Sequence, residues 1–151
     1  MGSSAETRRV LIVDDDPDLI ALMHDGLELA GNFQVEVATD GAAGLERCLA
    51  NRPTCVVVDV RLPALNGYQF MRALRGDPAT ADVPIVVLSA LVQDRERLAG
   101  MLAGADVYLF KPVRIADLVA AIDDIACLTA HQRSERRRTL TGDGSTEVRT
   151  P

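Results

Sequence analysis

Aromatic residues are scarce in this sequence, and their scarcity argues against one class of function. Tryptophan is absent from the 151 residues, and aromatic side chains make up 3% of them. Proteins that bind single-stranded nucleic acids stack bases on aromatic side chains, so a platform of that kind is not expected. The formal net charge of -6 also opposes binding to a phosphate backbone. We therefore predict no direct nucleic-acid binding by this chain.

Cysteines and long apolar runs are also few. The three cysteines (Cys48, Cys55 and Cys127) are far apart and form no C-x-x-C pair, which favours a reduced compartment over a disulfide framework. No apolar run approaches the ~20 residues of a membrane span, and the first residues lack the apolar core of a signal peptide. The prediction is a cytoplasmic protein with no membrane partner.

The composition is that of an ordinary globular domain with two polar ends. Apolar residues form 48% of the chain and charged residues 25%. Residues 1–7 are predicted to be a disordered N-terminus and residues 8–128 a single domain. The arginine-rich segment 129–151 is predicted to be a helix extension, with RSERRR as its solvated end, followed by a flexible tail or linker.

Within the domain, five apolar segments alternate with five amphipathic ones. Most of the apolar segments are rich in β-branched residues, and they span 10–13, 35–38, 54–60, 83–90 and 106–110. Nearly continuous apolar strands are typical of a parallel sheet buried on both faces. The segments between them have helical spacing and begin at capping residues such as Asp16, Asp40 and Asn66. The alternation predicts an α/β doubly wound fold with five strands and five helices.

Polar side chains gather where these strands end. In open α/β sheets, ligands bind beyond the carboxyl ends of the strands, which meet at one rim. The residues that fall there are Asp14 and Asp15 after the first strand, Asp59 after the third, Ser89 after the fourth and Lys111 after the fifth. Lys111 is also the single lysine of the chain. We expect these side chains to form one site.

The residue types in this site favour phosphoryl transfer. Crowded carboxylates repel each other unless a cation joins them. Mg²⁺ prefers one or two carboxylates together with water and a phosphate oxygen, so the site would be complete only with a phosphoryl group. A lysine ammonium and a serine hydroxyl can bind phosphoryl oxygens. A carboxylate nucleophile beside a metal ion and an ammonium is a known route to an aspartyl phosphate.

Four sequence strings at these positions resemble one family. VLIVDDDPDL, VVVDVRLPALNGYQF, VVLSA and GADVYLFKP together resemble the receiver domain of bacterial two-component response regulators, over about residues 8–128. The resemblance implies a flavodoxin-like, CheY-like sheet with the strand order 2-1-3-4-5. It also implies a role for each matching residue: Asp59 as phosphoacceptor, Asp14, Asp15, Asp59 and the backbone carbonyl of Arg61 as Mg²⁺ ligands, Ser89 and Lys111 as phosphoryl-binding residues, Tyr108 as the switch residue, and Pro112 as the residue after a cis peptide bond.

The resemblance further implies partners. A sensor histidine kinase or a histidine phosphotransfer protein would donate the phosphoryl group. Tyr108 would then turn inward and change the face formed by the fourth helix, fifth strand and fifth helix. That face would control a downstream protein partner or a fused output domain, or would form a homodimer. Arg61 and Leu91 stand where relatives influence phosphoryl loss, and Arg114 stands where relatives often carry an acidic residue.

Three alternatives remain open from the residues. The chain is either a stand-alone receiver or a module cut from a longer regulator with an output domain. It is expected not to be an enzyme, although a Mg²⁺-dependent phosphohydrolase with an aspartyl nucleophile is a rival. Such enzymes usually carry a second Asp two residues after the nucleophile, where this sequence has Arg61. A flavodoxin-like flavin binder is disfavoured because DDDPD would repel a phosphate after the first strand.

Overall fold

Five parallel strands form one sheet in the order β2-β1-β3-β4-β5. The computed structural model describes residues 7–90 and 94–142. Its strands are β1 (Arg8–Val13), β2 (Phe33–Ala38), β3 (Cys55–Asp59), β4 (Ile85–Ser89) and β5 (Val107–Phe110). The predicted doubly wound fold and its strand order are confirmed.

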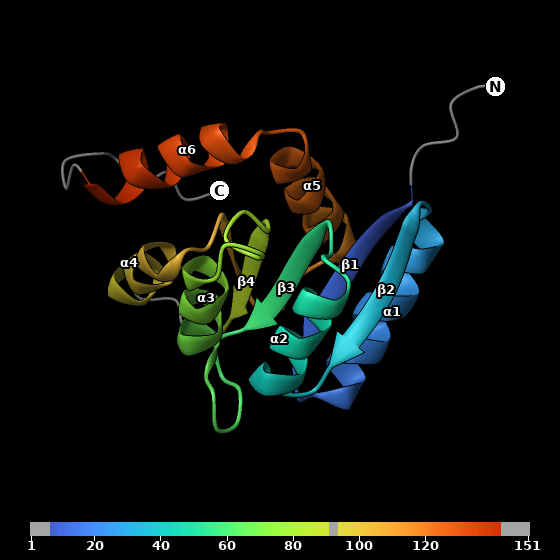
Figure 1. Ribbon diagram of the computed structural model, residues 1–151. Helices are drawn as coiled ribbons and strands as arrows, with labels where there is room; N and C mark the ends of the chain where they lie inside the picture. Colours follow the sequence, from blue (N-terminus) through green and yellow to red (C-terminus); the bar gives the residue numbers. More distant parts are fainter. Residues whose placement is uncertain (1–6, 91–93, 143–151) are drawn as a thin grey trace.

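Helices cover both faces of the sheet (Figure 1). They are α1 (Pro17–Ala30), α2 (Gly41–Ala50), α3 (Gly67–Gly76), α4 (Asp94–Ala103), α5 (Ile115–Ala126) and α6 (Ala130–Gly142). α1 and α5 pack on one face, and α2, α3 and α4 pack on the other. Among the described residues, no helix is both long and apolar enough to span a bilayer.

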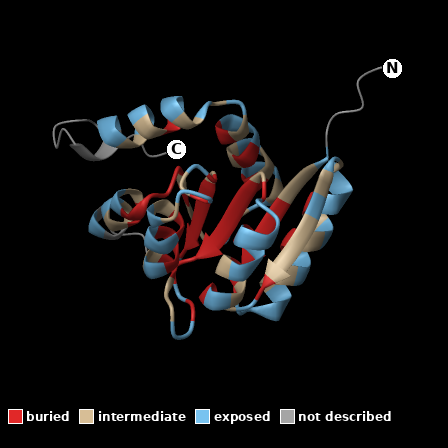
Figure 2. Cartoon of the chain, viewed as in Figure 1, coloured by how far each residue is buried: buried red, intermediate tan, exposed pale blue. Residues whose placement is uncertain are grey.

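The core follows from side-chain alternation along the strands. Val10 and Ile12 of β1 point to the layer of α1 and α5, whereas Leu11 and Val13 point to the layer of α2, α3 and α4. The central strands β3 and β4 are buried along their whole length, as Figure 2 shows in red. A strand covered on both faces has no polar side to present, and this explains the unbroken apolar runs in the sequence.

Three of the predicted helix starts are made by side-chain caps. The carboxylate of Asp16 accepts hydrogen bonds from the backbone N–H groups of residues 18 and 19 at the start of α1. Asp40 caps α2 through the backbone N–H of residue 43. Asn66 and Gln69 form a reciprocal capping box at the start of α3. These caps fix where each helix begins and therefore how the loop at the carboxyl end of the preceding strand is shaped.

The arginine-rich segment differs from its expected form. The fifth helix does not continue into it: α5 ends at Ala126, and a separate helix, α6, begins at Ala130. The Thr129 hydroxyl accepts a hydrogen bond from the Gln132 backbone N–H at 3.0 Å, and the Gln132 side chain accepts one from the Thr129 N–H at 2.9 Å. This capping box starts a new helix. α6 then crosses beyond the amino ends of the strands and contacts α4 (Figure 1).

Some expectations fall on segments that the structure does not cover. Residues 1–6, Leu91 and residues 143–151 lie outside the described residues. The expected disorder of the N-terminus, the influence of Leu91 on phosphoryl loss, and the expected tail or linker therefore stay predictions.

Candidate functional site

The strand register brings the predicted site residues together. Val13 of β1 lies beside Val58 of β3, so Asp14 and Asp59 follow side by side at the carboxyl rim of the sheet. Ser89 of β4 lies beside Phe110 of β5, which places Lys111 next to the serine. The Lys111 backbone N–H donates a 2.8 Å hydrogen bond to the Ser89 carbonyl oxygen.

Lys111 contacts two of the carboxylates directly. Its Nζ atom lies 2.8 Å from Asp59 Oδ2 and 3.6 Å from Asp14 Oδ2. Asp14 and Asp59 are buried, with 1% and 7% of their surface exposed, whereas Asp15 is exposed. One ammonium therefore faces two carboxylates in a partly water-excluded rim, where their charges interact more strongly than in bulk water.

Backbone amides hold the other carboxylate oxygens. The Asp16 backbone N–H donates to Asp14 Oδ1 at 2.9 Å, and the Arg61 backbone N–H donates to Asp59 Oδ1 at 3.0 Å. Asp14 Oδ2 is buried and has no hydrogen-bond partner among the residues that the structure describes. A buried carboxylate oxygen without a donor is energetically costly and is suited to a cation.

The donor set fits a hard divalent cation. Asp14, Asp15 and Asp59 can each offer a carboxylate oxygen, and these atoms lie within 4.8 Å of one another. Oxygen ligands of this kind suit Mg²⁺, which keeps several waters when few carboxylates bind it. Arg61 lies two residues after Asp59 in the chain, and the part of its backbone carbonyl as a ligand stays a prediction.

The electrostatics of the site also favour an added positive charge. Burial raises the pKa of the Asp14 carboxyl, and the charges of Asp59 and Asp15 add to the rise, although the hydrogen bond from Asp16 and the charge of Lys111 oppose it. For Lys111, burial lowers the pKa, but the hydrogen bond to Asp59 and the charges of both buried carboxylates outweigh it and raise the pKa. The raised pKa keeps the Lys111 ammonium charged, and the buried Asp14 carboxylate would be stabilised by an added cation.

Two further site residues lie where the sequence places them. Ser89 ends β4 and is 1% exposed. The Lys111–Pro112 peptide bond is cis, as the resemblance implies.

Tyr108 is already in the protein interior. It is 5% exposed, its ring centroid lies 5.4 Å from that of Phe110, and it packs directly against Gly100 of α4. A Cβ atom on Gly100 would lie 2.8 Å from Tyr108 Cδ2, so the glycine makes room for the ring. This differs from a side chain that starts outside and turns inward. Here, any change in Tyr108 would have to act through its contact with α4.

Two glycines of the site were missed by sequence reasoning. Gly100 in α4 and Gly67 at the start of α3 were not among the predicted site residues. A Cβ atom on Gly67 would lie 2.6 Å from the Asp59 carbonyl oxygen, so α3 can start this close to the end of β3 only at a glycine. Neither position carries a sequence signal that separates it from an ordinary turn or helix glycine.

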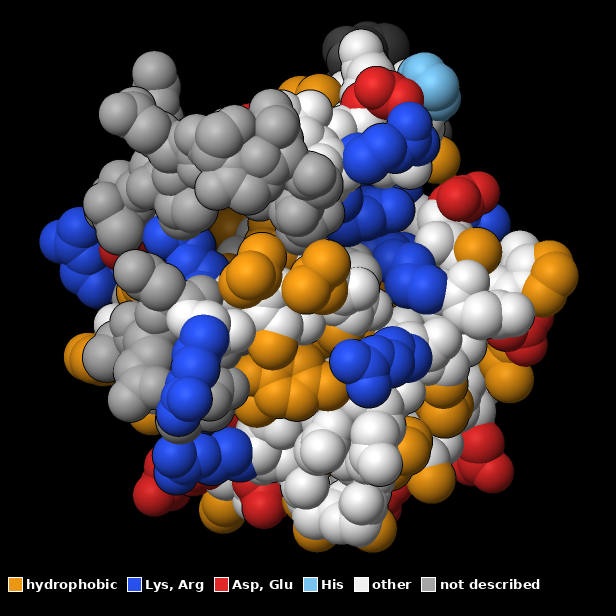
Figure 3. Space-filling model, turned by 90° about the vertical axis from the view of Figure 1, so that its left-hand side faces the viewer, with side chains coloured by type: hydrophobic (Ala, Val, Ile, Leu, Met, Phe, Trp, Pro, Cys, Tyr) orange, Lys and Arg blue, Asp and Glu red, His pale blue; other side chains and the backbone are white. Residues whose placement is uncertain are grey.

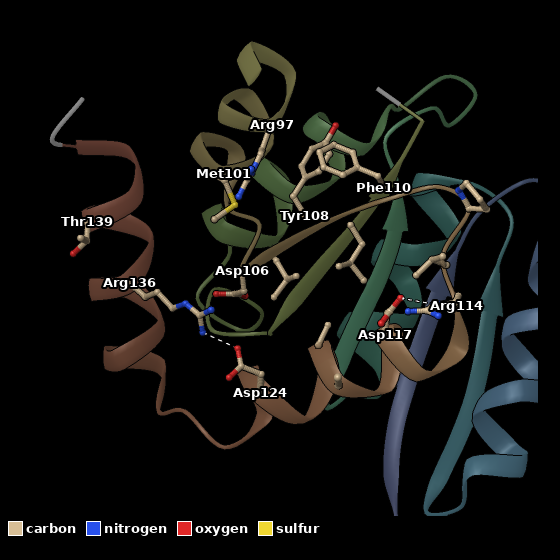
Figure 4. A pocket seen from close by; sticks show the side chains of 16 residues that line it. Arg97, Met101, Asp106, Tyr108, Phe110, Arg114, Asp117, Asp124, Arg136 and Thr139 are labelled. Carbon is tan, nitrogen blue, oxygen red and sulfur yellow. Dashed lines mark hydrogen bonds and ion pairs between the residues drawn. The ribbon is translucent and has the colours of Figure 1, made fainter. Parts of the chain in front are cut away.

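A groove lies along the predicted output face between α4, β5 and α5 (Figure 4). Its cavity has a volume of about 1060 Å³, and its floor is largely apolar. The charged residues at its edges include Arg97, Arg114, Asp117, Asp124 and Arg136. α6 forms one wall, because Arg136 binds Asp124 at 2.9 Å. Arg114 lies on this face and pairs with Asp117 at 3.2 Å.

Comparison with known proteins identifies the family that this chain is similar to. The profile of the response regulator receiver domain matches residues 10–123. The chain is 41% identical over 148 residues to the transcriptional regulatory protein PrrA of Mycobacterium tuberculosis, covering 98% of this chain and 58% of PrrA. It is 37% identical over 114 residues to the DNA-binding dual master transcriptional regulator RpaA of Synechocystis, covering 76% of this chain and 47% of RpaA. The chain thus spans about half the length of these relatives.

Solved structures resemble the whole sheet and its helices. A putative response regulator from Chloroflexus aurantiacus is 35% identical, with a TM-score of 0.75 over 82% of this chain and 100% of that one. The receiver domain of a sensor histidine kinase from Pseudomonas aeruginosa is 28% identical, with a TM-score of 0.74 over 81% of this chain and 98% of that one. That second structure has a magnesium ion coordinated in its active-site cleft.

Proposed function

The chain belongs to the response regulator receiver domain family, and we propose that it accepts a phosphoryl group on Asp59. The donor is a phosphohistidine of a sensor histidine kinase or of a histidine phosphotransfer protein. The observation that carries this proposal is the contact between Lys111 Nζ and Asp59 Oδ2 at 2.8 Å, with oxygens of Asp14 and Asp15 close by. An acceptor carboxylate, a fixed ammonium and a cation-binding carboxylate pair are the groups that phosphoryl transfer to an aspartate needs.

Each residue has a defined part in the transfer. Asp59 Oδ2 attacks the phosphorus atom, the N–P bond of phosphohistidine breaks, and its electron pair returns to the imidazole nitrogen. The Arg61 backbone N–H holds the other Asp59 oxygen and so fixes the direction of attack. Lys111 then passes from the carboxylate to a phosphoryl oxygen, and the Ser89 hydroxyl donates to another. Asp14, Asp15 and Asp59 would hold Mg²⁺, which would supply the charge that offsets the phosphoryl oxygens.

The switch is proposed to act through β5. This strand carries Tyr108 and leads directly into Lys111, so movement of the lysine toward a phosphoryl group pulls on the strand that packs against α4. A phosphoryl group that binds one arrangement better than the other shifts the population between the two. The groove between α4, β5 and α5 is the surface whose shape then changes.

The output is proposed to be regulatory rather than catalytic. PrrA and RpaA are transcriptional regulators by name, and both are longer than the segment matched here. A fused output domain or a separate cytoplasmic protein partner would respond to the groove, with homodimerisation through the same face as one form of response. Repeated release of phosphate from sugar phosphates would contradict this and favour a phosphohydrolase.

Intact-mass measurement after incubation with acetyl phosphate tests the proposal. The wild type should gain one phosphoryl group in the presence of Mg²⁺, and the increment should disappear with chelator or with the Asp59→Asn substitution. Asp25→Asn, an exposed carboxylate of α1, is the matched control and should be phosphorylated normally. Absence of both the increment and Mg²⁺ binding in the wild type would refute the proposal.

A further inference from the structure

A cluster of arginines lies at the amino end of β5, opposite the rim that carries Asp59. At its centre is Asp106, which is 5% exposed. Asp106 Oδ2 accepts from Arg75 of α3 at 3.0 Å, and Asp106 Oδ1 pairs with Arg137 of α6 at 2.5 Å. The Nε atom of Arg133, also from α6, lies 3.7 Å from Asp106 Oδ1. Three guanidinium groups thus converge on one carboxylate.

Arg75 uses all its donors inside the protein. Its Nε and Nη2 atoms donate to the Gly104 carbonyl oxygen, and its Nη1 donates to the carbonyl oxygens of Ala81 and Val83. With the bond to Asp106, the side chain has no donor left for a ligand. Its positive charge, however, is not cancelled, because Asp106 is shared with two other arginines.

Burial and like charge both act on this cluster. Burial lowers the pKa of the Arg75 guanidinium to about 10, and the charges of Arg137 and Arg133 add to the effect against the opposing charge of Asp106. Arg133 is 6% exposed, and its Nε atom has no hydrogen-bond partner among the described parts of the chain. Close arginines that share too few carboxylates repel one another, and an added anion relieves that repulsion.

A pocket opens over this cluster between α3, α4 and α6. Its volume is about 480 Å³, and it is lined by Arg72, Arg75, Arg137 and Arg138 together with Met101 and Leu102. We call it the arginine pocket. Figure 3 shows the face that carries α4 and α6, where basic side chains form a row beside exposed apolar ones. Such a row stands out in a chain whose formal net charge is -6.

The charge of the arginine pocket can be counted from its contacts. The pocket and the cluster beneath it contain the guanidinium groups of Arg72, Arg75, Arg133, Arg137 and Arg138. Among the residues with a described placement, two carboxylates pair with them: Asp106, and Glu135, which lies 3.2 Å from Arg138. The five guanidinium groups outnumber these two carboxylates.

We propose that the arginine pocket binds a small polyphosphate anion, a pyrophosphate or triphosphate group that is either free or carried by a nucleotide. A surplus of guanidinium groups suits a multiply charged phosphate chain. Arginine forks bind phosphate oxygens in pairs. No aromatic residue lines the pocket within the described chain, so the phosphates are recognised and a base is not stacked.

Binding would join two parts of the molecule. Arg72 belongs to α3, whereas Arg137 and Arg138 belong to α6, so an anion between them holds α6 against the domain. The site is separate from Asp59 and does not depend on phosphorylation or on Mg²⁺. Its success or failure therefore leaves the proposed function untouched.

Calorimetric titration of the full chain with sodium triphosphate, in the presence of chelator, tests the inference. The wild type and Asp59→Asn should bind one equivalent with the same affinity. Arg72→Gln combined with Arg138→Gln should weaken binding at least tenfold. Arg52→Gln combined with Arg114→Gln removes the same charge from exposed positions elsewhere and should change the affinity less than twofold. ATP is titrated in parallel to separate the two sources of the phosphate chain.

Two results of the titrations would uphold the arginine pocket. Equal binding of triphosphate and ATP identifies the phosphate chain alone as the ligand, and binding of ATP at least tenfold tighter identifies a nucleotide; both uphold the arginine pocket. Absence of binding, equal loss in the two double variants, or the same heat from sulfate at matched ionic strength would overturn it. Binding of duplex DNA without binding of triphosphate would also overturn it.

Discussion

Asp106→Asn is expected to destabilise the fold at a position distant from Asp59. The asparagine keeps the shape of the side chain, and its amide oxygen can still accept the Ile85 backbone N–H, which now donates to Asp106 Oδ2 at 2.8 Å. What disappears is the negative charge that Arg75, Arg133 and Arg137 share.

The size of the effect follows from burial. The Asp106 side chain is 2% exposed and that of Arg75 is 15% exposed, so neither group regains full hydration when the pair is broken. Removing one partner of a buried ion pair typically costs about 3–5 kcal/mol. At about 2–4 °C per kcal/mol for a domain of this size, the melting temperature should fall by about 6–20 °C.

The assay is urea unfolding with a matched control on the surface. Arg114 and Asp117 form a pair at 3.2 Å, nearly the same length as the Arg75–Asp106 pair at 3.0 Å, but their side chains are 84% and 53% exposed. Asp117→Asn should cost no more than about 0.5 kcal/mol, because exposed pairs of this spacing contribute little. The two variants differ in burial and in the number of arginines paired with the carboxylate, which is three for Asp106 and one for Asp117.

A loss below about 1 kcal/mol for Asp106→Asn, or a loss equal to that of Asp117→Asn, would refute the reasoning. It would mean that the three arginines gain water or another partner when Asp106 is neutralised. Combining Asp106→Asn with Arg75→Met then tests the coupling, and the losses should be smaller than the sum of the two single effects.

Three further predictions concern other sites. Asp14→Asn should raise the melting temperature at pH 7 without Mg²⁺, because the folded pKa of this carboxyl is raised and its ionisation destabilises the fold as the pH rises. The gain over the wild type should shrink toward pH 4. An equal difference between variant and wild type at both pH values would contradict this. Gly67→Ala should cost about 1–3 kcal/mol in urea unfolding, because the new Cβ would lie 2.6 Å from the Asp59 carbonyl oxygen, and a loss within error would contradict it. In a thiol-labelling assay, the exposed Cys127 should be the one thiol that reacts in the folded protein, and all three thiols should react after unfolding. Rapid labelling of a second thiol in the folded protein would contradict the burial of the other two cysteines.

The sequence by itself predicted the fold and the polar residues that meet at one rim of the sheet, but it missed Gly67 and Gly100. Alternating apolar strands and amphipathic helices admit few arrangements, and the helix caps at Asp16, Asp40 and Asn66 mark the boundaries locally. Because all strands are parallel, residues that follow them in the sequence must meet at one rim. That rule is enough to bring Asp59 and Lys111 together without knowledge of the tertiary structure.

The arginine-rich segment shows where sequence reasoning stops. RSERRR has the composition of a solvated helix end, and that expectation is wrong for Arg133, which is 6% exposed. Its partner Asp106 lies far away in sequence and reads as the first residue of an ordinary strand. Only the fold, which turns α6 back across the amino ends of the strands, brings the two together.

Across the molecule, local features could be predicted from the sequence, whereas features that depend on contacts between distant residues could not. Local signals such as caps, periodicity and strand ends depend on residues close in sequence, and the sequence therefore determined them by itself. Burial, charge balance and close packing depend on groups that meet only after folding. The tertiary structure alone decided that Asp14 carries a buried oxygen without a donor, that Gly100 makes room for Tyr108, and that three arginines share one carboxylate.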